Sequence, residues 1–428
     1  MAPYVDLTYF LFLLYPLALL VLLGLVGWLG APAILFVSAA VLVFQYADPL
    51  GTGAQQAEGL RQLELLAGYA VASVVVVTAF ALVRRRGASR PAFYAAVALA
   101  LAPLVVVKVA PLIAPRQALF GLVAAAPGAS AGVAAATPPP GLAPPPGALE
   151  IVGFLGVSYV TFRLIDVIVD LHDGIVSGVP SPMTLLGYLL FAPTISAGPI
   201  DRYKRFCGDL CAPRRTARAY LVDVEAGIHR IAQGFLYKFI LGYLVYQYVL
   251  LPLDAQSGVL AMVGYMYAYA FYLFFDFAGY SAFAIGAGRF FGVRVPENFD
   301  RPFASRTFRE VWDRWHITLS WWLRDHVYMR FMLKAGRAKW FGGDRVRASH
   351  VGLLLTMLLM GLWHGLYPHY VVYGLYQGAM LVVYDAVGRW NARRRLIPSG
   401  RLVRLGQVAL TFDLFCFGLL IFSGHLFT

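Results

Sequence analysis

Apolar segments of bilayer length recur along the whole chain, and they restrict its fold more than any other feature. Of the 428 residues, 60% are hydrophobic and only 13% are charged, whereas soluble domains carry about 45–50% apolar and about 25% charged residues. A bilayer core of about 30 Å needs about 20 apolar residues per helix. The pattern therefore predicts an all-α polytopic membrane protein. We place its spans at residues 9–28, 32–47, 64–83, 91–113, 150–169, 229–253, 257–285, 350–366, 369–388 and 405–425.

A shorter apolar segment at residues 184–199 contains Pro193, Gly198 and Pro199. Such a segment is too broken for a plain helix, so we expect a re-entrant or bent element that is buried in protein or lines a cavity. With it, the bundle has roughly eleven transmembrane or re-entrant helices. Residues 124–148 are rich in Ala and Pro and predict an external loop without a core of its own. They separate N-terminal transmembrane helices in 1–123 from a larger part, 149–428.

Basic residues gather in loops between the apolar segments. Of the 35 Lys and Arg residues, 28 lie in 84–90, 202–218, 289–314, 330–347 and 389–404. Clusters that flank spans are typical of the positive-inside rule and not of a nucleic-acid stripe. They predict a multi-pass protein with cytoplasmic basic loops and an outer N-terminus. No Lys or Arg precedes the first apolar run, so we interpret that run as a transmembrane helix and not a cleaved signal peptide.

Several common kinds of site have no signature in this sequence. There is no Walker-type phosphate loop, no nucleophile elbow and no His-Glu-x-x-His metal motif. Cys207 and Cys211 are spaced by four residues without obvious partners, and with Cys416 they make no disulfide framework. We therefore expect ordinary thiols, no metal site and no permanently bound cofactor.

Segment 296–349 mixes aromatic and charged residues. Trp312, Trp315, Leu319, Trp322, Met329 and Leu333 recur at helical spacing, while the charged positions between them lie opposite. This pattern predicts an amphipathic helix over 310–334 that lies in or against the cytoplasmic leaflet.

Two histidines lie in apolar surroundings. His364 sits in "LLMGLWHGLYP", between Gly361 and Gly365, which would let another group approach closely, and Trp363 and Tyr367 could form walls. His316 lies in "DRWHITLS", where the chain re-enters apolar surroundings. Ionisable residues at membrane depth are functional candidates, and an imidazole can take and return a proton near neutral pH. The alternative for His364 is that a neighbouring helix satisfies its imidazole.

Asp276, in "FFDFAGYS", is another polar residue within an apolar segment. It could be a cation or proton site, or it could be a structural acceptor for a buried hydroxyl or amine.

Two stretches resemble the membrane-bound O-acyltransferase family. "NFDRPFASRTFREVWDRWHITLSWWLRDHVYMRF" begins at residue 298, and "MGLWHGLYPHYVVYGLYQG" places His364 48 residues after His316. The family pairs a His or Asn in an "RWH"-like segment with a His in a "WHG"-like span. "LGVSYVTFRLIDVIVDLHDG" (155–174) and "FAPTISAGPIDRYKRF" (191–206) are similar to the D-alanylating branch of that family. The resemblance covers roughly 150–425 and makes 149–428 the catalytic core, with cytoplasmic amphipathic helices around a central tunnel.

The resemblance implies an O-acyltransferase of the bacterial plasma membrane. Its donor would be D-alanine held as a thioester on the phosphopantetheine arm of an acidic cytoplasmic carrier protein. The acceptor hydroxyl would come from the outer face, on the way to teichoic acid or another cell-envelope polymer. Further implied partners are a small single-span membrane peptide that accepts the alanine, and a membrane-anchored downstream transferase.

The same resemblance gives the residues expected roles. His364 would act as the general base, and His316 would position the reacting groups or stabilise the oxyanion. No residue has the surroundings of an activated nucleophile, so we expect direct transfer. Because the cytoplasmic face is basic, we expect an acidic carrier to dock there. Separately, we expect Asp201 to form a structural turn with Arg202 or Arg205. Tunnel support is assigned to Trp363, Trp315, Asp313, Arg314, Asn298, Ser320 and Asp276, and carrier docking to Arg324, Tyr328, Arg330, Met332, Leu333 and Lys334.

Three other functions compete with this one. An O-acetyltransferase of alginate, cellulose or peptidoglycan would share both histidines and use an acetyl donor. A secondary transporter would also have broken helices and intramembrane polar residues, but the two halves show no internal repeat. In a structural scaffold the histidines would be replaceable.

Overall fold

The structure, a computed structural model, describes residues 7–47, 51–87, 90–113, 156–212, 215–396, 398 and 400–427. Within these residues the regular secondary structure is helical, apart from one isolated antiparallel bridge between Phe299 and Trp315. The all-α prediction is therefore confirmed. The Ala/Pro-rich segment 124–148 lies outside the described residues. The chain divides into two compact units, the first from residues 1–138, 143–234 and 280–296 and the second from 139–142, 235–279 and 297–428.

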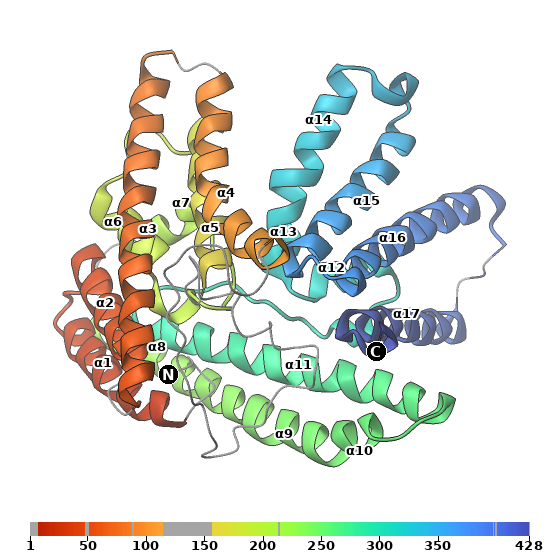
Figure 1. Ribbon diagram of the computed structural model, residues 1–428, viewed down its shortest axis with the longest axis horizontal. Helices are drawn as coiled ribbons and strands as arrows, with labels where there is room; N and C mark the ends of the chain where they lie inside the picture. The colour runs from red at the N-terminus through yellow and green to blue at the C-terminus, as the bar shows by residue number, and fades with distance from the viewer. Residues whose placement is uncertain are drawn as a thin grey trace. The chain divides into compact units, whose positions relative to one another are not determined.

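The first unit contains the N-terminal helices (Figure 1). The longest of them, α3, begins with a capping box, in which Thr52 and Gln55 satisfy each other's backbone N–H groups. Helices α2 and α3 pack on each other, as do α4 and α5. The helices of this unit are α1 (Leu7–Leu25), α2 (Ala31–Ala47), α3 (Gly53–Arg85), α4 (Arg90–Ile113), α5 (Val157–Asp173), α6 (Pro182–Leu189), η1 (Ala192–Thr194), α7 (Tyr203–Leu210) and α8 (Ala217–Phe235), whose last residue belongs to the second unit.

The second unit contains both candidate histidines. Its C-terminal helices α15, α16 and α17 pack consecutively on one another. Helix α11 (Val259–Phe290) belongs to this unit up to residue 279 and to the first unit beyond it. The other elements are η2 (Leu236–Gly242), α9 (Tyr243–Val245), η3 (Tyr246–Leu250), α10 (Leu251–Asp254), η4 (Pro302–Ala304), α12 (Phe308–Arg314), α13 (Ile317–Leu323), η5 (Arg324–Tyr328), α14 (Met329–Arg337), η6 (Trp340–Gly343), α15 (Arg345–His364), α16 (Pro368–Arg394), α17 (Arg401–Ser423) and η7 (His425–Phe427).

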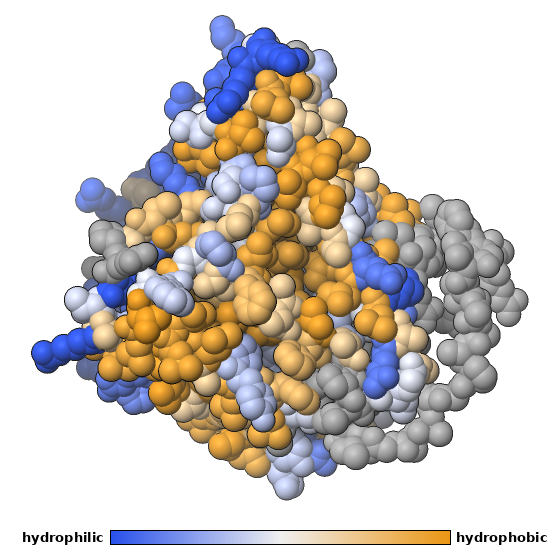
Figure 2. Space-filling view, turned by 90° about the vertical axis from the view of Figure 1, so that its left-hand side faces the viewer, coloured by the Kyte–Doolittle hydropathy of each residue, from blue (hydrophilic) through white to orange (hydrophobic). Residues whose placement is uncertain are grey.

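Eight helices of the described chain are long and apolar enough to cross a membrane. Their outer surfaces are apolar too: Leu14, Val71 and Leu99 have 60%, 63% and 60% of their surface exposed. Figure 2 shows orange, hydrophobic residues over most of the face on the side of α1, α2 and α3. Such a surface suits lipid and not water. The eight candidate segments are Thr8–Leu25, Gly53–Arg85, Arg90–Val109, Ala217–Asp254, Val259–Phe290, Arg345–His364, Pro368–Arg394 and Arg401–Ser423.

Two predicted spans are not among these eight membrane-crossing candidates, so the count of roughly eleven helices is not confirmed. Helix α2 is apolar but has only 17 residues. The predicted span at 150–169 overlaps α5 in its described part, and α5 also has 17 residues and is buried along almost its whole length. It carries Arg163, Asp166 and Asp170, and their charges suit an internal packing helix better than a lipid-facing one.

The predicted amphipathic helix over 310–334 is wrong as a single helix. The segment is divided into α12, α13, the π-turn η5 and α14. The break comes at Trp315 and His316, because His316 has φ 45° and ψ 49°, in the left-handed region that no α-helix can contain. The short antiparallel bridge from Trp315 to Phe299 holds the chain at this point.

The segment predicted to be broken, 184–199, is bent as expected. Helix α6 ends at Leu189, Pro193 lies in the single turn η1, and the chain then continues without regular structure to α7. Most of its residues are buried in the first unit.

Candidate active site

Helices α15 and α16 approach so closely that their backbones touch. A Cβ atom at Gly361 would collide with the carbonyl oxygen of Tyr370, and one at Gly374 would lie 2.5 Å from the carbonyl oxygen of Met357. Glycine is therefore required at both positions. The ring of Tyr370 also fills the space beside Gly365. Gly361 and Gly365 thus let another group approach closely, as expected, and that group is Tyr370 of α16.

His364 is the last residue of α15, and aromatic rings surround its half-buried imidazole. Tyr367, which we expected in this wall, is 43% exposed and instead stacks on His369. Sequence reasoning missed the rings from α16 and α17, although Tyr370 and Tyr373 are spaced by three residues on the helix that follows His364. The ring centroids around His364 are those of Trp363 at 4.5 Å, Phe422 at 4.9 Å, Tyr370 at 6.0 Å and Tyr373 at 6.3 Å.

His316 is buried, with 4% of its surface exposed, at the start of α13. Its ring lies 4.7 Å from that of Phe277, and no side chain or backbone group of the described chain hydrogen-bonds its Nε2. Burial lowers the pKa of His316 to about 3, so the imidazole is neutral at physiological pH. A left-handed backbone in a non-glycine residue is strained, and such strain is concentrated at functional sites.

Asn298 holds the turn that carries His316. Its Oδ1 accepts hydrogen bonds from the hydroxyl of Thr318 at 2.7 Å and from the backbone N–H of Thr318 at 3.3 Å. Its carbonyl oxygen accepts from the N–H of Ile317 at 3.0 Å. The hydroxyl of Ser320 donates to the carbonyl oxygen of His316 at 3.2 Å. Asn298 and Ser320, both expected to support the site, therefore fix the backbone on either side of the imidazole.

Trp363 connects the two histidines. Its ring centroid lies 6.5 Å from that of His316 and 4.5 Å from that of His364. The centroids of the two imidazoles can therefore be no farther apart than these two distances added together. The structure thus brings together three residues that the sequence singled out, from α15 and from the start of α13.

We expect Asn298→Ala to lower turnover more than Thr318→Val, because Asn298→Ala removes both hydrogen bonds from Thr318 and Thr318→Val removes only the one from its hydroxyl. Each should also lower the free energy of unfolding by about 1–3 kcal/mol, the cost of a buried polar group left without its partner. A double-mutant cycle on turnover and thermal unfolding checks this, with an expected coupling of about 0.5–3 kcal/mol. Strictly additive effects would show that the hydrogen bond does not position His316.

The other expected support residues lie around this turn. Trp315 is buried, and its ring lies 5.1 Å from Phe299 and 5.2 Å from Phe415. The carbonyl oxygen of Arg314 accepts a hydrogen bond from the N–H of Asp300 at 3.0 Å. Asp313 is exposed.

Asp276 pairs with the ammonium group of Lys238 from η2. Of the two possibilities left open for this carboxylate, the structure favours the acceptor of an amine. Sequence reasoning missed Lys238, since it is a single basic residue in an apolar run, 38 positions away.

The expected docking residues lie on η5 and α14 of the second unit. Leu333 is 57% exposed, and the ammonium of Lys334 lies 5.6 Å above the ring of Trp340. Tyr328 is half-buried, and its hydroxyl hydrogen-bonds that of Ser349 at 2.7 Å. Arg324 pairs with Asp325 at 2.8 Å, while Arg330 and Met332 are half-buried.

The bent segment of the first unit is anchored by Arg163 of α5. This guanidinium is 1% exposed and donates to the carbonyl oxygens of Tyr188 at 3.0 Å and Leu189 at 3.1 Å, and to the hydroxyl of Thr194. It therefore satisfies carbonyl groups at the end of α6 that have no helical partner. A charged side chain within an apolar stretch here serves to hold a broken backbone in place.

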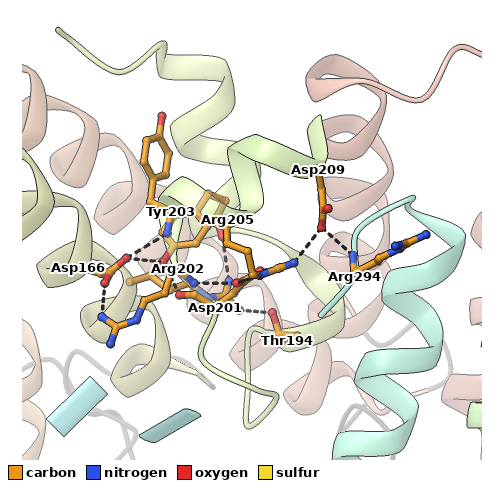
Figure 3. Close-up of polar contacts among 10 residues, drawn as sticks. Asp166, Thr194, Asp201, Arg202, Tyr203, Arg205, Asp209 and Arg294 are labelled. Carbon is orange, nitrogen blue, oxygen red and sulfur yellow. Dashed lines mark hydrogen bonds and ion pairs between the residues drawn. The ribbon is translucent and has the colours of Figure 1, made fainter. Parts of the chain in front are cut away.

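A second set of charges fixes the chain after the bend (Figure 3). Asp166, fully buried, accepts from Arg202 at 2.6 Å and from the N–H of Tyr203 at 3.0 Å. Asp201 pairs with Arg205, as expected, and accepts from the N–H of Arg202 at 2.7 Å. Arg205 also donates to Asp209 at 2.9 Å, and Asp209 accepts from the N–H of Arg294 at 2.8 Å.

Comparison of the sequence with known proteins identifies the family of the chain. The model of the membrane-bound O-acyltransferase family matches residues 171–425, a range that includes both histidines. The chain is 42% identical over 280 residues to the teichoic acid D-alanyltransferase of Bacillus subtilis strain 168, covering 65% of this chain and 70% of that one. It is 36% identical over 382 residues to the teichoic acid D-alanyltransferase of Lacticaseibacillus rhamnosus, covering 85% of each.

A second group of relatives carries a different name. The chain is 34% identical over 277 residues to the probable alginate O-acetylase AlgI of Pseudomonas fluorescens, covering 63% of this chain and 51% of that one. Both groups are named for acyl transfer. The chain therefore belongs to the membrane-bound O-acyltransferase family and is an acyltransferase.

Proposed function

We propose that the protein moves D-alanine from a thioester on the phosphopantetheine arm of a cytoplasmic carrier protein to a hydroxyl acceptor at the outer face of the plasma membrane. The observation that carries this proposal is the pair of histidines joined through Trp363, in a chain with D-alanyltransferase relatives. Those relatives are 36–42% identical over 70–85% of their length, whereas AlgI of Pseudomonas fluorescens is 34% identical over 51% of its length.

The reaction needs one base and no nucleotide. The acceptor oxygen attacks the thioester carbonyl carbon, His364 takes the hydroxyl proton, and the carbon–sulfur bond breaks. The proton then passes to the departing thiolate, so that an ester and a free thiol result. Proton transfer of this kind contributes about 10²–10⁴-fold to a rate.

His316 has a different role, because its imidazole is buried and neutral. A neutral imidazole donates from one nitrogen and accepts at the other. Held at a fixed angle by the Asn298 turn, it can donate to the oxygen that gains charge in the transition state.

The orientation and the partners complete the proposal. The N-terminus lies outside, the basic loops lie in the cytoplasm, and the acidic carrier docks on η5 and α14. The acceptor is a small single-span membrane peptide, from which a membrane-anchored transferase moves the alanine to teichoic acid or another envelope polymer.

We expect the double variant Arg330→Glu with Lys334→Glu to weaken carrier binding at least tenfold at low salt, because it reverses two charges on α14. Binding measured by fluorescence anisotropy at two salt concentrations checks this. Arg393→Glu with Arg394→Glu, the same change at the end of α16, is the matched control and should leave the affinity unaltered. Since Arg330 is half-buried, thermal unfolding is measured alongside. Equal affinity of a folded α14 variant and the parent protein would rule this docking surface out.

A second candidate function is O-acetylation of an exported polysaccharide, which the AlgI relatives favour. One experiment separates the two. The purified protein is given carrier loaded with D-alanine or with acetate, together with a membrane acceptor fraction, and loss of thioester and gain of ester are both measured. We expect turnover of the D-alanyl donor. Turnover of the acetyl donor alone would favour the second candidate, and turnover of neither would reject both.

A further inference from the structure

Gln377 of α16 is a buried amide without a hydrogen-bond partner in the described chain. The residue has no exposed surface, and neither its Oε1 nor its Nε2 is hydrogen-bonded. Burying an amide in this state costs about 1–3 kcal/mol in proteins. A leucine of similar size would avoid that cost, so the amide at this position points to a ligand.

The amide lies one helical layer from His364. Tyr370, Tyr373 and Gln377 are spaced by three and four residues, so they share one face of α16, and the first two contact the His364 ring. On the facing helix α17, a Cβ atom at Gly418 would lie 2.5 Å from the Nε2 of Gln377. Four residues beyond Gly418, the ring of Phe422 packs on His364 at 4.9 Å. Since a helical turn rises about 5.4 Å, the amide and the imidazole occupy consecutive layers between α16 and α17.

A second unpartnered group lies in the same region. The side chain of Tyr269 is fully buried, and its hydroxyl has no hydrogen-bond partner in the described chain. It lies in the neighbourhood of Tyr370 and Tyr373, the two rings that lie against His364. With the Nε2 of His316, three unsatisfied polar groups therefore lie near Trp363 and His364. Unsatisfied buried groups are rare in folded proteins, so their occurrence together is consistent with a polar substrate binding here.

The chemistry of an amide suggests which substrate. A glutamine side chain presents an acceptor oxygen and a donor nitrogen side by side. An α-aminoacyl group presents the complement, since its amino group donates and its carbonyl oxygen accepts. An acetyl group has the carbonyl alone and would leave the Oε1 of Gln377 unpaired. Sites that hydrogen-bond a polar substrate group reject analogues that lack it much more strongly than apolar pockets discriminate by size.

We propose that Gln377 is the specificity residue for the acyl donor, its Oε1 accepting a hydrogen bond from the α-amino group and its Nε2 donating to the acyl carbonyl oxygen. The inference rests on the proposed D-alanyl transfer and deepens it, since it names the group by which an aminoacyl donor is told from a simple acyl donor.

The test compares two small donors, S-(D-alanyl)pantetheine and S-propionylpantetheine, which differ only in the amino group. Single-turnover rates are measured for the parent protein and for Gln377→Leu. We expect the parent to prefer the D-alanyl donor. The substitution should lower D-alanyl transfer at least 50-fold. It should lower propionyl transfer much less, by at most about tenfold, because that donor loses only the hydrogen bond to its carbonyl oxygen. The melting temperature should rise, because an unsatisfied amide is removed.

Gln45→Leu is the matched control, since Gln45 is a buried glutamine of α2 in the first unit and 2% exposed. Gln45→Leu should not alter the ratio of the transfer rates from the two donors. Gln377→Glu, which keeps an acceptor but loses the donor, should retain part of the preference. If Gln377→Leu changes the transfer rates from both donors equally, or changes neither rate, the amide does not recognise the amino group and the inference is wrong. If the parent protein transfers neither donor from pantetheine or from carrier, the proposed function itself fails.

Discussion

His364→Ala should lower the rate constant of acyl transfer by about 10²–10⁴-fold, the contribution of a positioned general base. The imidazole ends α15, and aromatic rings fix it on several sides. Alanine removes the proton acceptor and leaves the thioester as reactive as before. Because the side chain is only half-buried, the variant should remain folded and should bind donor with unchanged affinity. Single-turnover loss of donor thioester, followed beside thermal unfolding, measures both quantities.

His369→Ala is the control for this variant. The ring centroid of His369 lies 4.1 Å from that of Tyr370, and Tyr370 in turn packs near His364, so the control removes an imidazole from the same aromatic group. Its transfer rate should stay within a few-fold of the parent. If His364→Ala transfers as fast as His369→Ala, the imidazole is structural and the mechanism fails.

Asp166→Ala should cost the largest amount of stability of any single substitution considered. The carboxylate is fully buried and holds both Arg202 and the N–H of Tyr203 (Figure 3). Removing one partner of a buried ion pair costs about 3–5 kcal/mol, and we expect the lower part of that range because the Arg202 side chain is 26% exposed. Without this contact the chain after the bent segment loses its anchor on α5.

Thermal unfolding in detergent checks this prediction. Asp166→Asn keeps an acceptor for the N–H of Tyr203 and should be intermediate. Asp325→Ala breaks the exposed pair with Arg324 and should cost no more than about 1 kcal/mol, as surface pairs do. A melting temperature of Asp166→Ala equal to that of Asp325→Ala would show that the buried network does not hold the bend.

The fold class and both candidate histidines could be predicted from sequence because each depends on a local signal. Apolar runs of bilayer length specify helices wherever they occur. His316 and His364 stand out because an imidazole is rare in such surroundings. The bend at 184–199 could also be predicted, since Pro193 and Pro199 prevent a continuous helix.

Other features depend on contacts between distant residues and could not be predicted in this way. The regular spacing of Trp312, Trp315 and Leu319 indicates one helix, but the hydrogen bonds that Asn298 accepts and the bridge to Phe299 hold a left-handed turn at His316. A local periodicity carries no information on that tertiary contact.

The surroundings of His364 show the same limit. Gly361 and Gly365 indicate that something approaches closely, but only the packing of α15 on α16 shows that it is Tyr370. Likewise, the charge of Arg163 in an apolar stretch could not reveal that it caps the end of α6.

The most direct test of acyl transfer by this protein uses proteoliposomes with donor and acceptor on opposite sides. Carrier loaded with radiolabelled D-alanine is added outside, a hydroxyl acceptor is enclosed, and wild type is compared with His364→Ala. We expect label to accumulate inside as a hydroxylamine-sensitive ester with wild type and not with the variant. Label that stays on the carrier, that is released only as free alanine, or that crosses equally with both proteins would contradict it.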